Sequence, residues 1–113
     1  MTEFYKGTGW SKDYIGFCEN GDICIGSGWS KSYIGVYKDG DIYEGTGWGK
    51  TLVGCYKDGD VYKGTGWSKT LVGSYKDGNI YEGTGWGKSC VGEYKGYDEG
   101  AAAAALLLLI KNR

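Results

Sequence analysis

Apolar and glycine positions recur along this chain with a period of nineteen residues. Each copy opens on Gly-x-Gly-Trp-x-Lys, continues through two mostly apolar residues and a glycine, and ends on a second short apolar segment. The copies begin at Gly7, Gly26, Gly45, Gly64 and Gly83. A fixed period of this kind predicts one supersecondary unit per copy, which buries its apolar side only against neighbouring copies.

The turn inside each copy is predicted most clearly. Two residues of the Asn-Gly or Asp-Gly type separate short aromatic and β-branched segments, and a type I′ hairpin turn needs these residues because both positions have positive φ. Pairing across Asp39-Gly40 places Tyr37 opposite Ile42 and Val36 opposite Tyr43. The four turns are Asn20-Gly21, Asp39-Gly40, Asp58-Gly59 and Asp77-Gly78.

The buried face of each hairpin is left open by the pattern. Strict alternation separates Ile34 from Tyr37, although both positions are filled uniformly in the other copies. A β-bulge at Gly35 would bring both side chains to one face. The alternative is a sheet that is partly covered on both faces.

Counting the strands predicts a closed architecture. Only four turns connect five strands of the Val-Gly-x-Tyr type to five of the Ile-Tyr type, so Phe4-Tyr5 and the segment 91–94 are left without partners. An open sheet would expose both as edges, which proteins avoid. We therefore expect an all-β repeat fold in which five hairpin repeats, residues 1–100, close into a pseudo-five-fold ring.

The C-terminal segment, residues 101–113, contrasts with the repeats. Five alanines, four leucines and an isoleucine carry no polar stripe, which predicts a short helix at about 101–111 that is buried on all sides. Acidic Asp98 and Glu99 before it and basic Lys111 and Arg113 after it suit the helix dipole. Ten residues rise about 15 Å, too little to span a membrane. A helix packed on or inside the ring is the expected arrangement.

The repeat, together with this Ala- and Leu-rich segment, resembles the bacterial five-fold β-flower proteins. The resemblance covers essentially the whole chain and implies a fold but no activity. The tryptophan in every copy departs from that pattern. Weaker likenesses are to MORN repeats, through Asp-Gly-x-Ile-Tyr-x-Gly, and to choline-binding repeats, through Gly-Trp with paired tyrosines.

Composition narrows the classes of partner and compartment. The net charge of −1 gives no electrostatic basis for binding nucleic acid or an acidic membrane. Cys18, Cys24, Cys55 and Cys90 occupy unequal places in the repeat, which is typical of apolar fillers that remain thiols. The first residues do not form a signal peptide. We expect a cytoplasmic protein, with a protein partner or a homo-oligomer as the possible assemblies.

Each copy carries two candidate ligand-binding positions. The tryptophans could stack on sugars or enclose a quaternary ammonium group, although large aromatic residues more often fill the seams between elements, and seam filling is the interpretation we favour. The lysines two residues later could form a circle of positive charge for an anion, or could simply be solvated. The positions are Trp10, Trp29, Trp48, Trp67, Trp86, Lys12, Lys31, Lys50, Lys69 and Lys88.

Catalytic chemistry has no basis in this sequence. There is no histidine, no cysteine cluster at metal-binding spacing, and no nucleophile with a recognisable base. We therefore expect no enzyme, cofactor or metal site. The leading hypothesis is a structural or interaction module; the alternatives are a multivalent small-ligand binder and a peripheral membrane protein attached by Leu106–Ile110.

Overall fold

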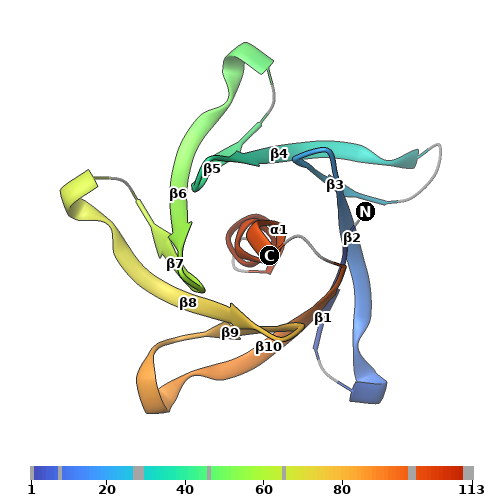
Figure 1. The fold of residues 1–113 in the computed structure, drawn as a ribbon. Helices are drawn as coiled ribbons and strands as arrows, with labels where there is room; N and C mark the ends of the chain where they lie inside the picture. The colour runs from blue at the N-terminus through green and yellow to red at the C-terminus, as the bar shows by residue number, and fades with distance from the viewer. Residues whose placement is uncertain are drawn as a thin grey trace.

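The computed structural model describes residues 2–7, 9–26, 30–45, 47–64, 66–96 and 99–110. Ten antiparallel strands form one closed barrel around a central helix, α1 (Figure 1). The all-β repeat predicted from the sequence is confirmed. The strands are Thr2–Lys6 (β1), Asp13–Glu19 (β2), Asp22–Ile25 (β3), Ser32–Lys38 (β4), Asp41–Glu44 (β5), Thr51–Lys57 (β6), Asp60–Lys63 (β7), Thr70–Lys76 (β8), Asn79–Glu82 (β9) and Ser89–Lys95 (β10).

Consecutive strands alternate between two kinds of connection. Asn-Gly and Asp-Gly turns lie close to the centre, whereas the Gly-Trp segments lie at the outer ends (Figure 1). We use the word petal for each strand pair joined by a Gly-Trp segment, and tip for that segment. The petals are β1–β2, β3–β4, β5–β6, β7–β8 and β9–β10.

The inner turns have the backbone geometry that the sequence predicts. Asp39 and Gly40 both have positive φ, 53° and 86°. Tyr37 pairs with Ile42, as expected for a two-residue turn. The Gly40 carbonyl also accepts a hydrogen bond of 2.9 Å from the Tyr56 N–H, so each turn connects one copy to the next.

A β-bulge between copies settles which residues face the core. In the pairing of β3 with β4, Ile23 is opposite Gly35 and Cys24 is opposite Tyr33, which leaves Ile34 as the extra residue. Ile34 packs against the core while Tyr33 is half exposed. The bulge interpretation is therefore correct, and the same register shift recurs in the other ladders between copies.

The first and last strands close the barrel. β1 pairs with β10, with Phe4 opposite Tyr94 and Tyr5 opposite Glu93. The Gly7 N–H donates to the Val91 carbonyl at 2.8 Å, as Gly45, Gly64 and Gly83 do to the equivalent carbonyls. Phe4 is completely buried. The ring predicted from the unpaired arms is confirmed.

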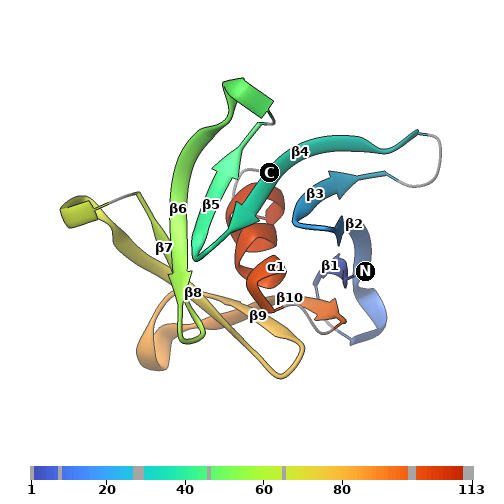
Figure 2. The same cartoon turned by 45° about the horizontal axis from the view of Figure 1, so that its top comes forward.

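The central helix corrects the expected boundaries. It begins at Glu99 rather than 101, is α-helical to Ala105 (α1), and continues as a π-helix over Leu106–Ile110 (η6). The expected end at 111 and the flanking charges Asp98, Lys111 and Arg113 lie outside the described residues. Residues 101–110 are at most 7% exposed. Figure 2 shows the helix running through the barrel with strands on all sides.

The π-helix lets five consecutive side chains each meet a different copy. An α-helix turns about 100° per residue, more than the fifth of a circle that separates neighbouring copies. The wider i→i+5 turn comes closer to that rotation. Each side chain lies beside the glycine that follows a bulge, where an added Cβ would collide with it or come into tight contact. The pairs are Leu106 with Gly73, Leu107 with Gly54, Leu108 with Gly35, Leu109 with Gly16, and Ile110 with Gly92.

Candidate binding surface

Each described tip is a single 3₁₀ turn with tryptophan at its middle position. Glycines open the turn because the backbone there has positive φ, for example 88° at Gly45 and 63° at Gly47. The described turns are Gly9–Ser11 (η1), Gly47–Gly49 (η3), Gly66–Ser68 (η4) and Gly85–Gly87 (η5). The repeated motif therefore presents tryptophan at the end of a petal.

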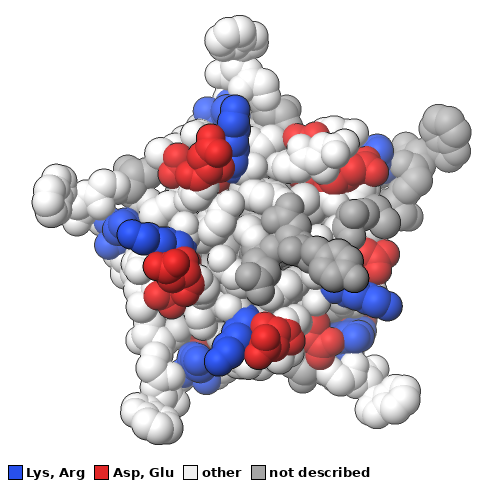
Figure 3. Space-filling model, in the orientation of Figure 1, with Lys and Arg blue, Asp and Glu red and all other residues white. Residues whose placement is uncertain are grey.

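The tryptophan side chains point into solvent, so the seam-filling interpretation is wrong. Trp10, Trp48 and Trp67 are each 105% exposed and Trp86 is 107% exposed, relative to a reference residue. Flanking glycines give them nothing to pack on. Figure 3 shows uncharged side chains projecting from the tips, with charged groups nearer the centre. Trp29 lies outside the described residues.

The lysines lie over aromatic rings on the outer surface of the petals. The Lys50 ammonium is 4.8 Å from the ring centroid of Tyr43, and three other copies repeat this geometry. Those pairs are Lys12 with Tyr5 at 4.8 Å, Lys69 with Tyr62 at 4.9 Å, and Lys88 with Tyr81 at 4.9 Å. Cation–π attraction favours this placement of the ammonium groups.

Lys31 departs from this arrangement because its petal, β3–β4, lacks the tyrosine. Cys24 stands at that position, and Lys31 lies instead 5.5 Å from the Tyr33 ring and 5.9 Å from the Phe17 ring. Its ammonium is 3.8 Å from a carboxylate oxygen of Glu19. The five lysines, which the sequence left as either a circle of charge or solvated turn residues, therefore do not all have the same surroundings.

The residue opposite the tyrosine decides how much charge each lysine presents. We call this position the seam residue. Tyr5 pairs with Glu93 across the β1–β10 ladder, whereas the corresponding tyrosines in the petals β5–β6, β7–β8 and β9–β10 pair with uncharged residues. These pairs are Tyr43 with Val36, Tyr62 with Cys55, and Tyr81 with Ser74.

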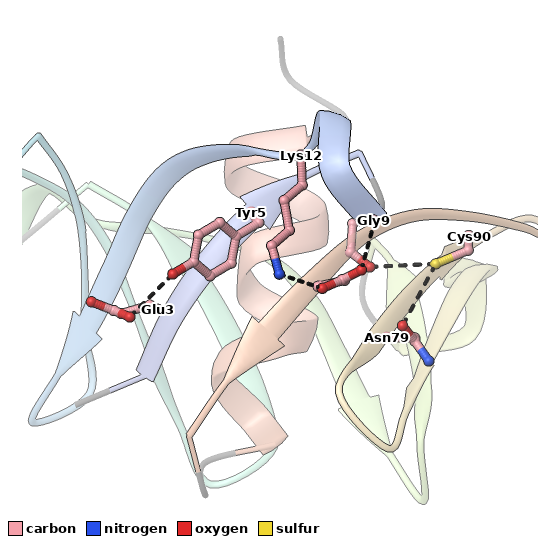
Figure 4. Close-up of polar contacts among 8 residues, drawn as sticks. Glu3, Tyr5, Gly9, Lys12, Asn79 and Cys90 are labelled. Atoms are coloured by element: carbon pink, nitrogen blue, oxygen red, sulfur yellow. Dashed lines mark hydrogen bonds and ion pairs between the residues drawn. The ribbon is translucent and has the colours of Figure 1, made fainter.

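Glu93 neutralises the first lysine. The Lys12 ammonium donates to Glu93 Oε1 at 2.9 Å, and the Gly9 N–H donates to Oε2 at 3.2 Å, as Figure 4 shows. The hydrogen bond from Lys12 lowers the pKa of Glu93, and the same bond raises the pKa of Lys12. Glu93 therefore ties the first tip to the neighbouring petal.

Three lysines have no such partner. Among the described residues, no carboxylate forms an ion pair with Lys50, Lys69 or Lys88. The five positions are consequently not equivalent. The sequence analysis missed this difference, although its signal is present: Glu93 is acidic where the other copies have Phe17, Val36, Cys55 and Ser74.

A groove of about 500 Å³ lies between two of these petals. Leu52 and Cys55 on β6 form one wall, and Gly66 and Lys69 of the next petal form the other. The inner end is polar, because the hairpin turn with Asp39 and Asp41 also lines it, together with Tyr56 and Lys57. The groove therefore lies between one tip, at Gly66, and the inner turn at Asp39 and Asp41.

The cysteines are thiols, as expected from the sequence. Cys18 and Cys24 are buried fillers, and burial raises the pKa of the Cys24 thiol. Cys18 donates to the Tyr37 hydroxyl at 3.3 Å. Cys90 is exposed, so the filler interpretation is wrong for this residue. It stands just before the bulge in β10, at the outward-facing position that Leu52 occupies in β6.

Comparison with known proteins gives no relative: no family model, no curated protein and no solved structure matches this chain. Within the described residues, no helix is both long and apolar enough to cross a membrane. No group of three or more metal-ligating side chains occurs in the same residues. Leu106–Ile110, the segment of the membrane-attachment hypothesis, is buried inside the barrel.

Proposed function

We propose that this chain is a non-catalytic, multivalent binding module that contacts a repetitive partner through the tryptophans at its petal tips. The observation that supports this most is the complete exposure of the four described tip tryptophans. Tryptophan carries a large apolar surface, and where it is not buried within its own fold it is enriched at sites that bind other molecules. The proposed partner is a polysaccharide, whose sugar rings offer flat apolar faces at regular intervals.

Multivalency compensates for the small size of each contact. A single exposed aromatic ring makes a weak site, but several on one rigid scaffold raise the overall affinity by orders of magnitude when they engage one polymer. The barrel is about 41 × 38 × 24 Å, so the tips are held apart on a rigid frame. The resemblance to five-fold β-flower proteins stays a prediction and adds no activity.

Titration of the full chain tests the proposal. Tryptophan emission would be followed on addition of choline, glucose, galacturonate, and neutral and acidic polysaccharides. We expect polymers to bind at least tenfold more tightly than their monomers, because avidity requires several tips. Replacing tip tryptophans by serine one after another should weaken polymer binding at each step. Equal affinity for monomer and polymer, or no loss in the serine series, would overturn the proposal.

A further inference from the structure

We infer that an acidic polysaccharide, a polymer of uronate-type sugars, binds across the petals β5–β6, β7–β8 and β9–β10 and not equally around the barrel. This inference rests on the proposed function. It names the class of ligand and the petals that bind it. It follows from the inequality of the five lysine positions.

Among the five lysines that follow the tip tryptophans, those without a carboxylate partner in the described residues lie on one side of the barrel. Lys12 is paired with Glu93 at 2.9 Å, and Lys31 has Glu19 at 3.8 Å. Among the described residues, Lys50, Lys69 and Lys88 have no carboxylate at ion-pair distance. These three lysines belong to consecutive petals, so their charge forms one arc.

The three ammonium groups are also held in place for a ligand. Each lies 4.8–4.9 Å from a tyrosine ring centroid, which limits the motion of the long side chain before a ligand arrives. Less ordering entropy is then lost on binding. Two residues before each lysine stands an exposed tryptophan of the same tip. Every petal of the arc thus presents an aromatic face and a cation. These two groups can bind the ring face and the carboxylate of a uronate sugar.

The groove beside Lys69 extends from one tip of the arc to an inner turn. Its walls carry Leu52 on one petal and Lys69 on the next. The carboxylates of Asp39 and Asp41 line the inner end and would repel an anion. A uronate therefore fits with its carboxylate at the Lys69 end and with its sugar ring toward the tips.

Charge density favours an acidic polysaccharide over single-stranded nucleic acid. Nucleic-acid-binding surfaces are strongly basic and combine many cations with stacking aromatics. This chain has a net charge of −1, and each tip in the arc is followed by one lysine without a carboxylate partner in the described residues. A polymer whose sugars each carry one carboxylate and a weakly hydrated ring face can supply both contacts at each petal without a high density of cations on the protein.

The test exchanges the seam residues of two petals, because the first petal shows what a carboxylate at this position does to the lysine. Ser74→Glu places a carboxylate opposite Tyr81, as Glu93 stands opposite Tyr5, and should neutralise Lys88. Glu93→Ser makes the opposite change and should release Lys12. The full-length variants would be titrated with polygalacturonate, with its methyl ester as a neutral polymer of the same backbone, and with oligothymidylate. Lys88→Gln serves as a second variant, and circular dichroism checks that each variant folds.

We expect Ser74→Glu and Lys88→Gln to weaken binding of polygalacturonate by about two- to fivefold, which is the range for an exposed ion pair. Glu93→Ser should strengthen it by a similar factor, and binding of the methyl ester should not change. Added salt should reduce the preference for the acid.

Three results would overturn the inference. One is equal loss of acidic and ester binding in Ser74→Glu, and another is tighter binding of oligothymidylate than of polygalacturonate at the same salt concentration. The third is binding of both sugar polymers through the tryptophans with no effect of any charge variant, in which case the proposed function stands. Failure of both polymers to bind the parent protein would overturn the two proposals together.

Discussion

The centre and the tips of this barrel both consist of glycine next to large apolar side chains, with opposite results. At the centre, Leu106–Ile110 are at most 7% exposed, whereas the described tip tryptophans are more than 100% exposed. A glycine that faces the helix makes room for an apolar side chain from another element to pack. The described glycines directly beside a tip tryptophan have nothing within 4 Å of the place of a Cβ, so no neighbour covers the tryptophan. Whether glycine leads to burial therefore depends on what approaches it.

Removing β1 should break the centre most completely. Deletion of residues 1–6 unpairs β10, exposes two strand edges and removes Phe4, whose burial alone contributes about 1.5–3 kcal/mol. The truncated chain should melt far below the parent or aggregate, as measured by thermal unfolding and size-exclusion chromatography. Phe4→Ala, which keeps the strand, should cost about 3–5 kcal/mol. An unchanged melting temperature after deletion would mean that closure contributes nothing to stability.

Adding a methyl group by Gly→Ala substitution should distinguish the glycines at the centre from those at the tips. In Gly54→Ala the new Cβ would collide with the Tyr62 carbonyl oxygen and with Leu107, and we expect a loss of about 1–3 kcal/mol or more from overpacking. Gly49→Ala is the matched control at a tip, where a Cβ meets nothing within 4 Å. Urea unfolding should show a large loss for the first variant and almost none for the second. Equal losses would remove the distinction between centre and tip.

The centre could be predicted from the sequence because it follows from the number of strands and turns. Four Asn-Gly or Asp-Gly turns for ten predicted strands imply a closed barrel, and a helix without a polar stripe has to be buried. The π-helical segment could not be predicted, because only the angular separation of the five copies requires it. Gly35 indicated the bulge, but the choice of face required the observed pairing of Tyr33 with Cys24.

The tips and seams were harder to predict, for two physical reasons. The size and apolarity of tryptophan favoured burial, yet Gly-Trp-Gly and Gly-Trp-Ser leave no side chain nearby to cover it. The seam residue acts across the ladder between neighbouring petals, and Glu93 reaches Lys12 because that lysine lies over Tyr5, a side-chain placement that the sequence pattern does not give. A single departure from the repeat, Glu93, was the available signal.

The Lys12–Glu93 pair should make a small, pH-dependent contribution at the rim. The pKa of Glu93 lies below its ordinary value of 4.5, so this contribution is complete above pH 4.5 and is lost as the pH falls through the lowered pKa. The pKa of Lys12 lies above 10.5, so the contribution is lost again as the pH rises through that raised value. Glu93→Gln should slightly lower the melting temperature at pH 7 and match the parent at pH 2.

Both groups of this pair are partly exposed, with side chains 38% and 25% accessible, so solvent screens much of the interaction. Glu44→Gln is the control, because Glu44 has no ion partner among the described residues. A difference between Glu93→Gln and the parent that persists unchanged at pH 2 would show that lost packing, and not the ion pair, is responsible.

The smallest effect on stability is expected at the tips, where it is most informative. Trp67→Ser removes the largest side chain in the protein from a position where it contacts solvent on all sides, so the free energy of unfolding should change by no more than about 0.5 kcal/mol. Leu107→Ala, a smaller truncation at the centre, should cost about 2–5 kcal/mol because it leaves a cavity. Urea unfolding followed by far-UV circular dichroism compares them without relying on tryptophan emission.

If Trp67→Ser costs as much as Leu107→Ala, the tryptophan packs within the fold in solution and is not available for binding. If it costs nothing, folding does not account for a tryptophan at this position, and a ligand remains the explanation.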